Sequence, residues 1–186
     1  EMPPWVRVQR MQRDIPVKFI DAGVKRSDLR NLVDIELVER GKKSMEIRGR
    51  EVGLKEIKGG EFNLIRRDYR ASGSSEAFLS FEDDHDNISG FIRLRKPSSK
   101  AHREELKNSS MIREMKVLGN VVPVGEKSSE GFQHKGLGKK LLEESERISR
   151  EEWGMSRILV ISGIGVREYF RKTGYERVGP YMGKDI

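Results

Sequence analysis

The stretch from residue 111 to residue 162 constrains the fold more than any other part of this chain. An alternating run, Met111–Val117, precedes a glycine-containing loop, and a helical pattern follows from about Gly136. That helix turns leucines to one face and glutamates mostly to the other, and Gly154 ends it. A short apolar run at residues 157–162 then indicates a buried strand. This order predicts a sheet with a helix packed against it.

The loop before that helix is the part of the sequence best suited to chemistry. It reads Gln133-His134-Lys135-Gly136-Leu137-Gly138. Glycines there let the backbone approach a ligand closely, and the free N–H groups of a helix start attract phosphate. The string lacks both the Gly-Lys-Ser/Thr of a nucleotide P-loop and the glycine triplet of a Rossmann fold. We interpret His134 as a loop residue near phosphate rather than as a catalytic base.

Two regions precede this unit. Strand-like runs at residues 62–66, 77–81 and 88–94 indicate an antiparallel meander, and a polar connection at 96–109 joins it to the next strand. The first fifty-five residues suggest a piece of something larger, because one helix and a few short strands cannot enclose a core alone.

That first region has its own local signals. A helical pattern covers residues 29–37, with Ser27 as a candidate N-cap and Gly41 as a C-terminal stop. Alternation predicts a short strand at residues 5–11, and residues 45–48 and 50–52 resemble two more.

Composition excludes several classes of site. The chain has no cysteine, which rules out disulfides, iron–sulfur clusters and thiolate metal sites, and its three scattered histidines predict no metal site. No apolar run approaches the roughly 20 residues that cross a bilayer, and the start lacks a signal-peptide core. We therefore expect a cytoplasmic protein without membrane contact. The net charge of +7 suits RNA or a phosphate-bearing cofactor, and it equally suits a solvated surface of mixed charge.

The order of these motifs resembles the GNAT acetyltransferase superfamily. Its pyrophosphate loop has the form (Gln/Arg)-x-x-Gly-x-(Gly/Ala), and its aromatic-basic-x-Gly-aromatic segment matches Glu168-Tyr-Phe-Arg-Lys-Thr-Gly-Tyr175. The resemblance implies an α+β fold, in which a mixed and mostly antiparallel sheet is flanked by helices. The sheet would be splayed open between the strands at 111–117 and 157–162, and acetyl-CoA would lie in that gap.

Further runs resemble the family of Elongator catalytic subunits and span nearly the whole chain. They include Pro3-Pro4-Trp5-Val6-Arg7, Arg48-Gly49-Arg50-Glu51-Val52, Phe132-Gln133-His134 and Val160-Ile-Ser-Gly-Ile-Gly-Val-Arg167. That family joins a radical-SAM domain to a GNAT domain and modifies the wobble uridine (U34) of tRNA with acetyl-CoA. The resemblance implies that residues 1–55 are a small α/β remnant, the C-terminal end of a radical-SAM domain. Residues 56–186 would be the GNAT acetyltransferase domain.

The resemblance also implies cofactors and partners. Acetyl-CoA and tRNA are expected, with other Elongator-type subunits or a second copy of the chain as protein partners. Full-length members also use S-adenosylmethionine and a 4Fe–4S cluster, which this cysteine-free chain cannot hold. The expected activity is therefore acyl transfer with tRNA-dependent cleavage of the acetyl-CoA thioester, without the radical step.

Three segments carry the implied cofactor contacts. The strand edge would pair with the pantetheine arm, the loop and helix start would hold the pyrophosphate, and the aromatic segment would meet the acyl end. The cofactor-binding residues so assigned are Glu114, Met115, Lys116, Val117, Gln133, Gly136, Leu137, Gly138, Lys139, Tyr169 and Phe170.

Two side chains are candidates for catalysis. Glu114 either acts as a base through a water or meets the cofactor through its backbone alone. Many GNAT members carry a Tyr at the position of Phe170, where it protonates the departing thiolate. Phe cannot donate that proton, so Tyr169 is the candidate acid unless the thiolate leaves unassisted.

RNA contacts are expected in the basic first region, at Arg7, Arg10 and Arg13. Two other functions also fit the sequence. A protein lysine acetyltransferase of the histone or tubulin type would use the same cofactor site beside an acidic substrate groove. A non-catalytic module would position RNA or partner subunits and would not bind acetyl-CoA.

Overall fold

The computed structural model describes residues 2–13, 15–26, 28–52, 61–118 and 136–186. The chain divides into two compact units, Glu1–Glu51 and Val52–Ile186, and each has its own architecture. The boundary expected from the sequence, between residues 55 and 56, lies outside the described residues.

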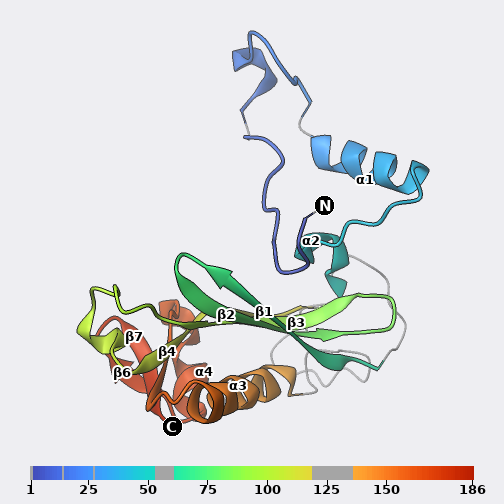
Figure 1. The fold of residues 1–186 in the computed structure, drawn as a ribbon. Coiled ribbons are helices and arrows are strands. Elements are labelled where there is room, and N and C mark those ends of the chain that lie inside the picture. Colours follow the sequence, from blue (N-terminus) through green and yellow to red (C-terminus); the bar gives the residue numbers. More distant parts are fainter. Residues whose placement is uncertain (1, 14, 27, 53–60, 119–135) are drawn as a thin grey trace. The chain divides into compact units, whose positions relative to one another are not determined.

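The larger unit is built on a seven-stranded sheet (Figure 1). Neighbouring strands run antiparallel except β4 and β5, which are parallel. In spatial order the strands are β1 (Asn63–Ala71), β2 (Ser74–Glu82), β3 (Ile88–Lys96), β4 (Ser109–Val117), β5 (Arg157–Val160), β7 (Tyr181–Asp185) and β6 (Glu176–Val178).

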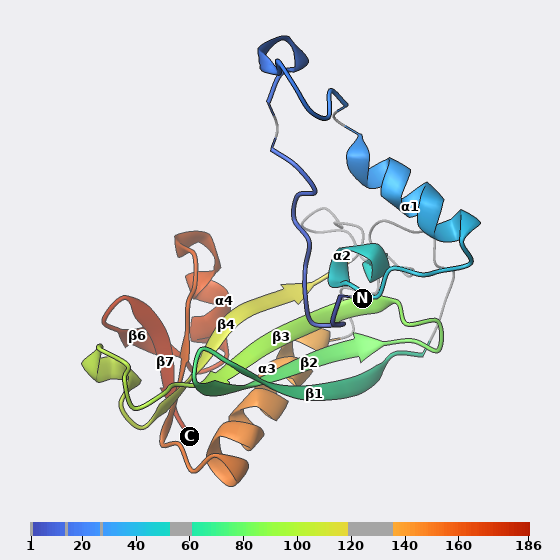
Figure 2. The same ribbon diagram turned by 45° about the horizontal axis from the view of Figure 1, so that its top comes forward.

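Two helices belong to this unit. The first, α3 (Leu137–Arg147), lies against β2, β3 and β4 and continues as a π-helical turn, Ile148–Glu152 (Figure 2). The second, α4 (Arg167–Lys172), follows a 3-10 turn at Ile164–Val166. A further 3-10 turn, Glu104–Leu106, precedes β4.

Strand alternation explains how this core forms. Successive side chains of a strand point to opposite faces, so one face of the sheet takes every second residue. The core collects Ala77, Leu79 and Phe81 from β2, and it packs them against the apolar stripe of α3, including Leu141 and Leu142. The outward glutamates of α3 leave its other face polar, as the sequence predicted.

The expected fold class is confirmed. The sheet is mixed and mostly antiparallel, helices flank it, and its one parallel pair joins the two strands between which the resemblance placed an opening. The last strand, β7, was not expected from the sequence. It forms because Gly179, at φ +56°, lets the chain turn back after β6 and pair with both β6 and β5.

The smaller unit contains the helix that the sequence predicted. This helix, α1, spans Leu29–Glu39, and Gly41 follows it at φ +62°, the left-handed conformation typical of a helix stop. The expected N-cap, Ser27, lies outside the described residues. A 3-10 turn, Val17–Phe19, precedes α1.

The predicted strands at residues 45–48 and 50–52 are wrong: residues Ile47–Arg50 form a short helix, α2. The Glu46 carboxylate decides this, because it accepts hydrogen bonds from the backbone N–H groups of Gly49 at 2.7 Å and Arg48 at 3.1 Å. A side chain that satisfies the first N–H groups of a helix stabilises its start.

The predicted strand at residues 5–11 is also wrong. Its backbone groups bind side chains and a helix start instead of a neighbouring strand. The N–H of Val8 donates to Glu46 at 2.8 Å, and the C=O of Val8 accepts from Arg30 at 3.0 Å. The C=O of Val6 accepts from the N–H of Ile47 at 2.8 Å. With these partners, no strand ladder is needed to satisfy the backbone.

Candidate functional site

β4 and β5 separate at one end, and this opening positions the candidate site. The two strands pair only between Ser109–Ile112 and Arg157–Val160. β4 then continues to Val117 with β3 as its partner. Its other edge therefore carries backbone N–H and C=O groups toward the opening. An extended ligand can pair with such an edge as an added strand does.

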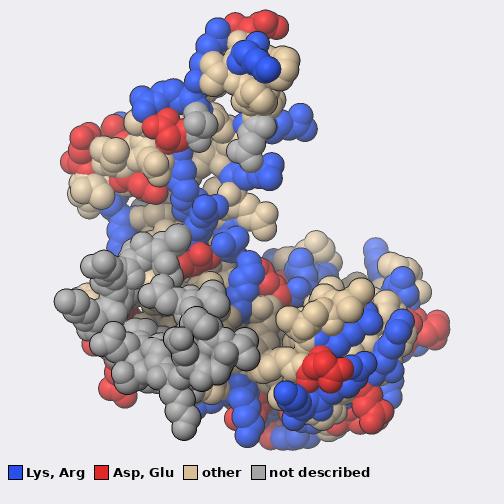
Figure 3. Space-filling view, turned by 180° about the vertical axis from the view of Figure 1, so that it is seen from behind, with Lys and Arg blue, Asp and Glu red and all other residues tan. Residues whose placement is uncertain are grey.

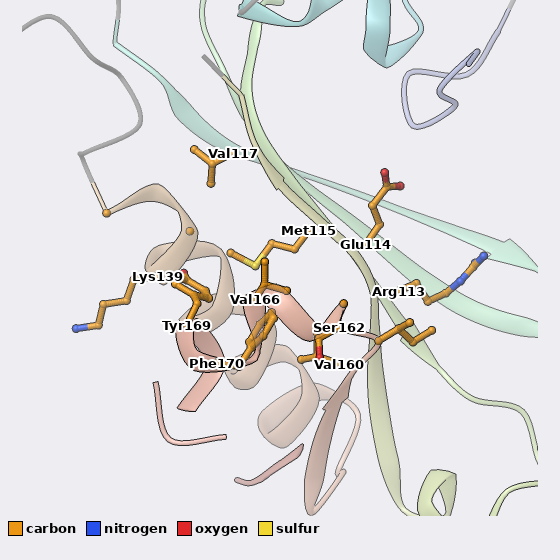
Figure 4. A pocket seen from close by; sticks show the side chains of 14 residues that line it. Arg113, Glu114, Met115, Val117, Lys139, Val160, Ser162, Val166, Tyr169 and Phe170 are labelled. Atoms are coloured by element: carbon orange, nitrogen blue, oxygen red, sulfur yellow. The ribbon is translucent and has the colours of Figure 1, made fainter. Parts of the chain in front are cut away.

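A cavity of about 680 Å³ fills the opening, and its volume is typical of a cofactor site. Its walls come from β4, the start of α3, the segment after β5, and α4 (Figure 4). The lining residues are Arg113, Glu114, Met115, Val117, Gly136, Gly138, Lys139, Val160, Ile161, Ser162, Gly163, Val166, Tyr169 and Phe170.

Eight of the cofactor residues expected from the sequence line this cavity: Glu114, Met115, Val117, Gly136, Gly138, Lys139, Tyr169 and Phe170. Two others do not. Lys116 places its ammonium 3.0 Å from a carboxylate oxygen of Glu114, and Leu137 belongs to the core. Gln133 and His134 lie outside the described residues.

The start of α3 combines close approach with free backbone donors. Gly136 precedes the helix at φ +68°, a conformation that glycine adopts without strain. The first N–H groups of a helix have no partner within it, so those of Leu137, Gly138 and Lys139 can bind an anion. A methyl group on Gly138 would lie 2.8 Å from the hydroxyl of Tyr169 and 2.9 Å from Met115 Cε. A side chain at position 138 would therefore have to displace the end of the Tyr169 or Met115 side chain.

Glu114 is held by two cations. Its carboxylate accepts from Arg93 Nε at 2.9 Å and lies 3.0 Å from Lys116 Nζ. Burial alone would raise the pKa of Glu114, but the hydrogen bonds from Arg93 and Lys116 outweigh burial and lower the pKa. A carboxylate with a lowered pKa is a weak base at neutral pH. Figure 4 shows its carboxylate pointing away from Met115, Tyr169 and Phe170. The geometry favours backbone contact over base catalysis.

The two aromatic residues of α4 have different environments. Phe170 is buried and lies edge-on between Tyr169 and Tyr175, with ring centroids 5.4 and 5.6 Å away. Tyr169 is 41% exposed, and burial of the rest of its side chain raises the pKa of its phenol. Its hydroxyl lies beside Gly138, at the helix-start side of the cavity. Phe170 is therefore a fixed wall, and Tyr169 reaches across to α3.

A β-bulge lies beside the cavity. Adjacent residues Arg93 and Leu94 of β3 pair with Glu114 and Ile112 of β4, which leaves Arg113 as an extra residue. Bulges bend a strand and re-aim its peptide groups, and they are common next to active sites. This bulge therefore turns the backbone at the point where β4 and β5 begin to separate.

The Arg113 side chain is tied to a buried carboxylate. It donates to Glu76, which is 1% exposed and also accepts from Tyr69 and Arg95, each at 2.6 Å. Burial alone would raise the pKa of Glu76, but the hydrogen bonds from Tyr69 and Arg95 and the charge and hydrogen bond of Arg113 outweigh it and lower the pKa. The ion pairs hold Arg113 in place on the bulge.

Sequence reasoning missed the wall that follows β5. Ile161, Ser162, Gly163 and Val166 line the cavity, and none was assigned a role. The only signal was the run Val160–Arg167, which entered as part of the family resemblance. Nothing in its composition showed that it faces the same cavity as β4.

The basic residues of the smaller unit do not share one environment. Arg7 forms an ion pair with Glu51 at 2.7 Å, whereas Arg10 and Arg13 are exposed. Figure 3 shows Lys and Arg interspersed with Asp and Glu on the visible face of this unit. Of the three predicted RNA contacts, Arg7 is half-buried, and Glu51 compensates its charge.

Within the ranges that the structure describes, no group of three or more His, Cys, Asp or Glu side chains could hold a metal ion. No helix in these ranges has the length and apolar character to cross a membrane.

The chain is similar to known proteins over its whole length. It is 47% identical over 191 residues to "Elongator complex protein 3" of Danio rerio and 45% identical over 193 residues to that of Saccharomyces cerevisiae. Each alignment covers 100% of this chain and 35% of the relative, so the chain spans about a third of the length of these relatives.

A solved structure agrees with this. The archaeal Methanocaldococcus infernus Elp3 with an N-terminal deletion superposes with a TM-score of 0.88 and 46% identity, over 100% of this chain and 45% of that one. No protein-family model matches the chain. Identity of this level over the full chain, with the same fold, shows that the chain belongs to the Elongator complex protein 3 family.

Proposed function

We propose that this chain is an acetyltransferase domain that binds acetyl-CoA between β4 and β5 and presents the acetyl group for modification of the tRNA wobble uridine. The observation that carries the proposal is the cavity between the two diverging strands, with a glycine-rich helix start at its side. The family resemblance implies this activity, and we propose it for the whole protein.

The cavity residues fit acetyl-CoA segment by segment. The free edge of β4 at residues 113–117 would bind the amides of the pantetheine arm. The N–H groups at the start of α3 would bind the pyrophosphate, and Gly138 leaves room for it. Phe170 and Val160 are buried and would enclose the acyl end and keep water out. When bound, acetyl-CoA supplies an activated acyl thioester.

Two roles follow for the side chains near the acyl end. Backbone N–H groups on the turned segment at Arg113 would donate to the thioester carbonyl, as preorganised donors do. Tyr169 keeps its proton at neutral pH as an ordinary tyrosine does, and burial raises its pKa further. Its position beside Gly138 suits contact with the pantetheine arm, and we assign it at most a weak role as the acid for the departing thiolate.

A lysine acetyltransferase is the alternative, and the charges near the cavity disfavour it. A lysine acceptor needs a base to remove its proton and carboxylates to attract it. Among the lining residues described, the carboxylate is Glu114, which two cations already neutralise. RNA as acceptor does not require a free carboxylate to attract it.

The domain assignment follows from the same resemblance. We propose that residues 1–55 are the end of a radical-SAM domain and that S-adenosylmethionine and a 4Fe–4S cluster bind to a part of the protein that carries cysteines. We also propose a cytoplasmic location, with tRNA and other Elongator subunits as partners.

Titration calorimetry with acetyl-CoA tests the proposal, followed by a thiol-release assay with and without tRNA. We expect saturable binding and thiol release that tRNA stimulates. A chain without affinity for acetyl-CoA would be a non-catalytic module. Thiol release that responds to basic peptides and not to tRNA would favour the lysine acetyltransferase.

A further inference from the structure

The segment that follows β5 contains two buried polar atoms without partners. Ser162 Oγ and Arg167 Nε are both covered from solvent, and neither has a hydrogen-bond partner among the residues that the structure describes. Buried polar groups in native proteins are nearly always hydrogen-bonded, so each exception needs an explanation. Two such atoms within six residues indicate a site that a ligand completes.

The charge of Arg167 is also uncompensated within the described residues. It forms no ion pair there, although it begins the same helix as Arg171, which pairs with Glu168. Leaving a buried hydrogen-bonding group of an arginine unmatched costs free energy, which an anionic ligand would recover. An arginine whose guanidinium has no ion-pair partner among the described residues is available to bind a phosphate, a group that arginine commonly recognises.

The same segment is unusually apolar for a surface. Ile164 is 82% exposed, Ile161 56% and Val166 50%, and Gly163 and Gly165 keep the backbone accessible between them. Ile161, Ser162 and Val166 also line the cavity (Figure 4). An apolar rim and an unmatched hydroxyl therefore lie at the cavity, and Arg167, with its unmatched guanidinium nitrogen, follows Val166 directly in the chain.

We propose that this turn, residues 161–167, is the acceptor subsite and binds one nucleotide of the RNA beside the acetyl group. Arg167 binds the phosphate, Ser162 donates to a polar oxygen of the nucleotide, and the flat face of the base packs on Ile164 and Val166. RNA is read mainly through unstacked bases and their phosphates, which this combination matches. The inference rests on the proposed function, because the subsite is useful only next to a bound acyl group.

The charge of Arg167 also bears on specificity. A lysine acceptor would bring a second cation toward an arginine that no described carboxylate neutralises, and such a contact is repulsive. A polyanion gains from the same arginine. The subsite therefore selects RNA over a basic peptide before any chemistry occurs.

The test uses the full-length protein and an unmodified tRNA transcript. Arg167→Gln removes the charge, and Arg171→Gln on the same helix is the matched control. We expect Arg167→Gln to weaken tRNA binding roughly tenfold, the loss of one charge-assisted hydrogen bond, and Arg171→Gln to change it less than about twofold. Arg167→Lys should recover part of the affinity. Affinity for CoA should not change in Arg167→Gln, because Arg167 does not line the cavity.

A second variant keeps the proposal testable if Arg167→Gln unfolds. Ile164 is 82% exposed, so Ile164→Ser should fold normally, and we expect it to raise the KM for tRNA several-fold in the thiol-release assay. The subsite is wrong if both variants bind tRNA like the parent, or if Arg167→Gln loses CoA affinity instead. A parent protein that binds no CoA would overturn the proposed function and the subsite together.

Discussion

Gly138 and Tyr169 touch across the cavity: a methyl group on the glycine would lie 2.8 Å from the tyrosine hydroxyl. The contact joins the start of α3 to α4, the two elements that border the opening between β4 and β5. Any side chain at position 138 must displace either this tyrosine or a ligand. This relationship makes the glycine the sharpest single test of the cofactor site.

Gly138→Glu should abolish measurable CoA binding, because it adds both bulk and a negative charge where the pyrophosphate would lie. Isothermal titration with CoA measures this. Gly165→Ala is the matched control, since a methyl group there meets nothing within 4 Å and we expect unchanged CoA affinity. Unaltered affinity in Gly138→Glu would remove the cofactor from this cavity.

Substitutions at Phe170 and Tyr169 should distinguish a role in CoA binding from a role in protonating the departing thiolate. Phe170→Ala removes a buried ring and should lower the free energy of unfolding by about 3–5 kcal/mol and weaken CoA binding. Tyr169→Phe removes only the hydroxyl, and we expect thiol release to fall less than about tenfold, below the usual range for a general acid. Chemical denaturation and the tRNA-stimulated thiol-release assay measure the two effects. A hundredfold loss in Tyr169→Phe with intact CoA binding would identify it as the acid.

Glu114→Gln should lower stability at neutral pH and make stability less dependent on pH in acid, with little effect on activity at neutral pH. Because the folded pKa of Glu114 is lowered, its ionised form stabilises the protein above its unfolded pKa of about 4.3. That contribution is lost as the pH falls through the lowered folded pKa. The unfolding free energy of Glu114→Gln should therefore depend less on pH below about 4 than that of the parent, by urea denaturation. Thiol release that loses a hundredfold at pH 7.5 would instead show that Glu114 is the base.

Arg10 and Arg13 should contribute to tRNA binding through charge alone. Replacing both with Gln should lower the affinity and make its salt dependence shallower by about two in the log–log slope. Arg7→Gln should instead reduce stability, because it leaves the carboxylate of Glu51 without its partner. Filter binding over a salt series and thermal unfolding measure the two. Equal salt slopes in the double variant and the parent would assign Arg10 and Arg13 to the solvated surface.

The larger unit was predictable from its sequence because local and tertiary signals agree there. Leu141 and Leu142 recur on one face of a helix, and Ala77, Leu79 and Phe81 alternate on a strand, so periodicity alone identified these elements. In the smaller unit, the same kind of pattern led to a wrong prediction of strands. Met45–Arg48 resembles a strand, but Glu46 caps the backbone as a helix, and that choice depends on a carboxylate that also binds Arg30.

The site was predictable only in part. Glycines at a helix start are compatible with phosphate binding, and the motif together with the family resemblance singled out Gly136 and Gly138, which line the cavity. Ser162 and Val166 were not, because their role depends on a parallel pairing between strands that lie forty residues apart. Tyr169 and Phe170 both line the cavity, but which of them is buried depended on the rotation of a short helix, which the packing of Phe170 against Tyr175 decides.

Four residue pairs tie β4 to β5, and the N–H of Ile161 donates to the C=O of Ile112 just beyond them. The β3–β4 ladder on one side has six pairs and the β5–β7 ladder on the other has four, so the junction is a short seam in the sheet. A cofactor that pairs with the free edge of β4 would close that seam, and at one hundred times its Kd it would add about 2.7 kcal/mol to the stability of the fold. The thermal tolerance of this domain, and the rate at which its amides at residues 113–117 exchange with deuterium, would then follow the supply of acetyl-CoA.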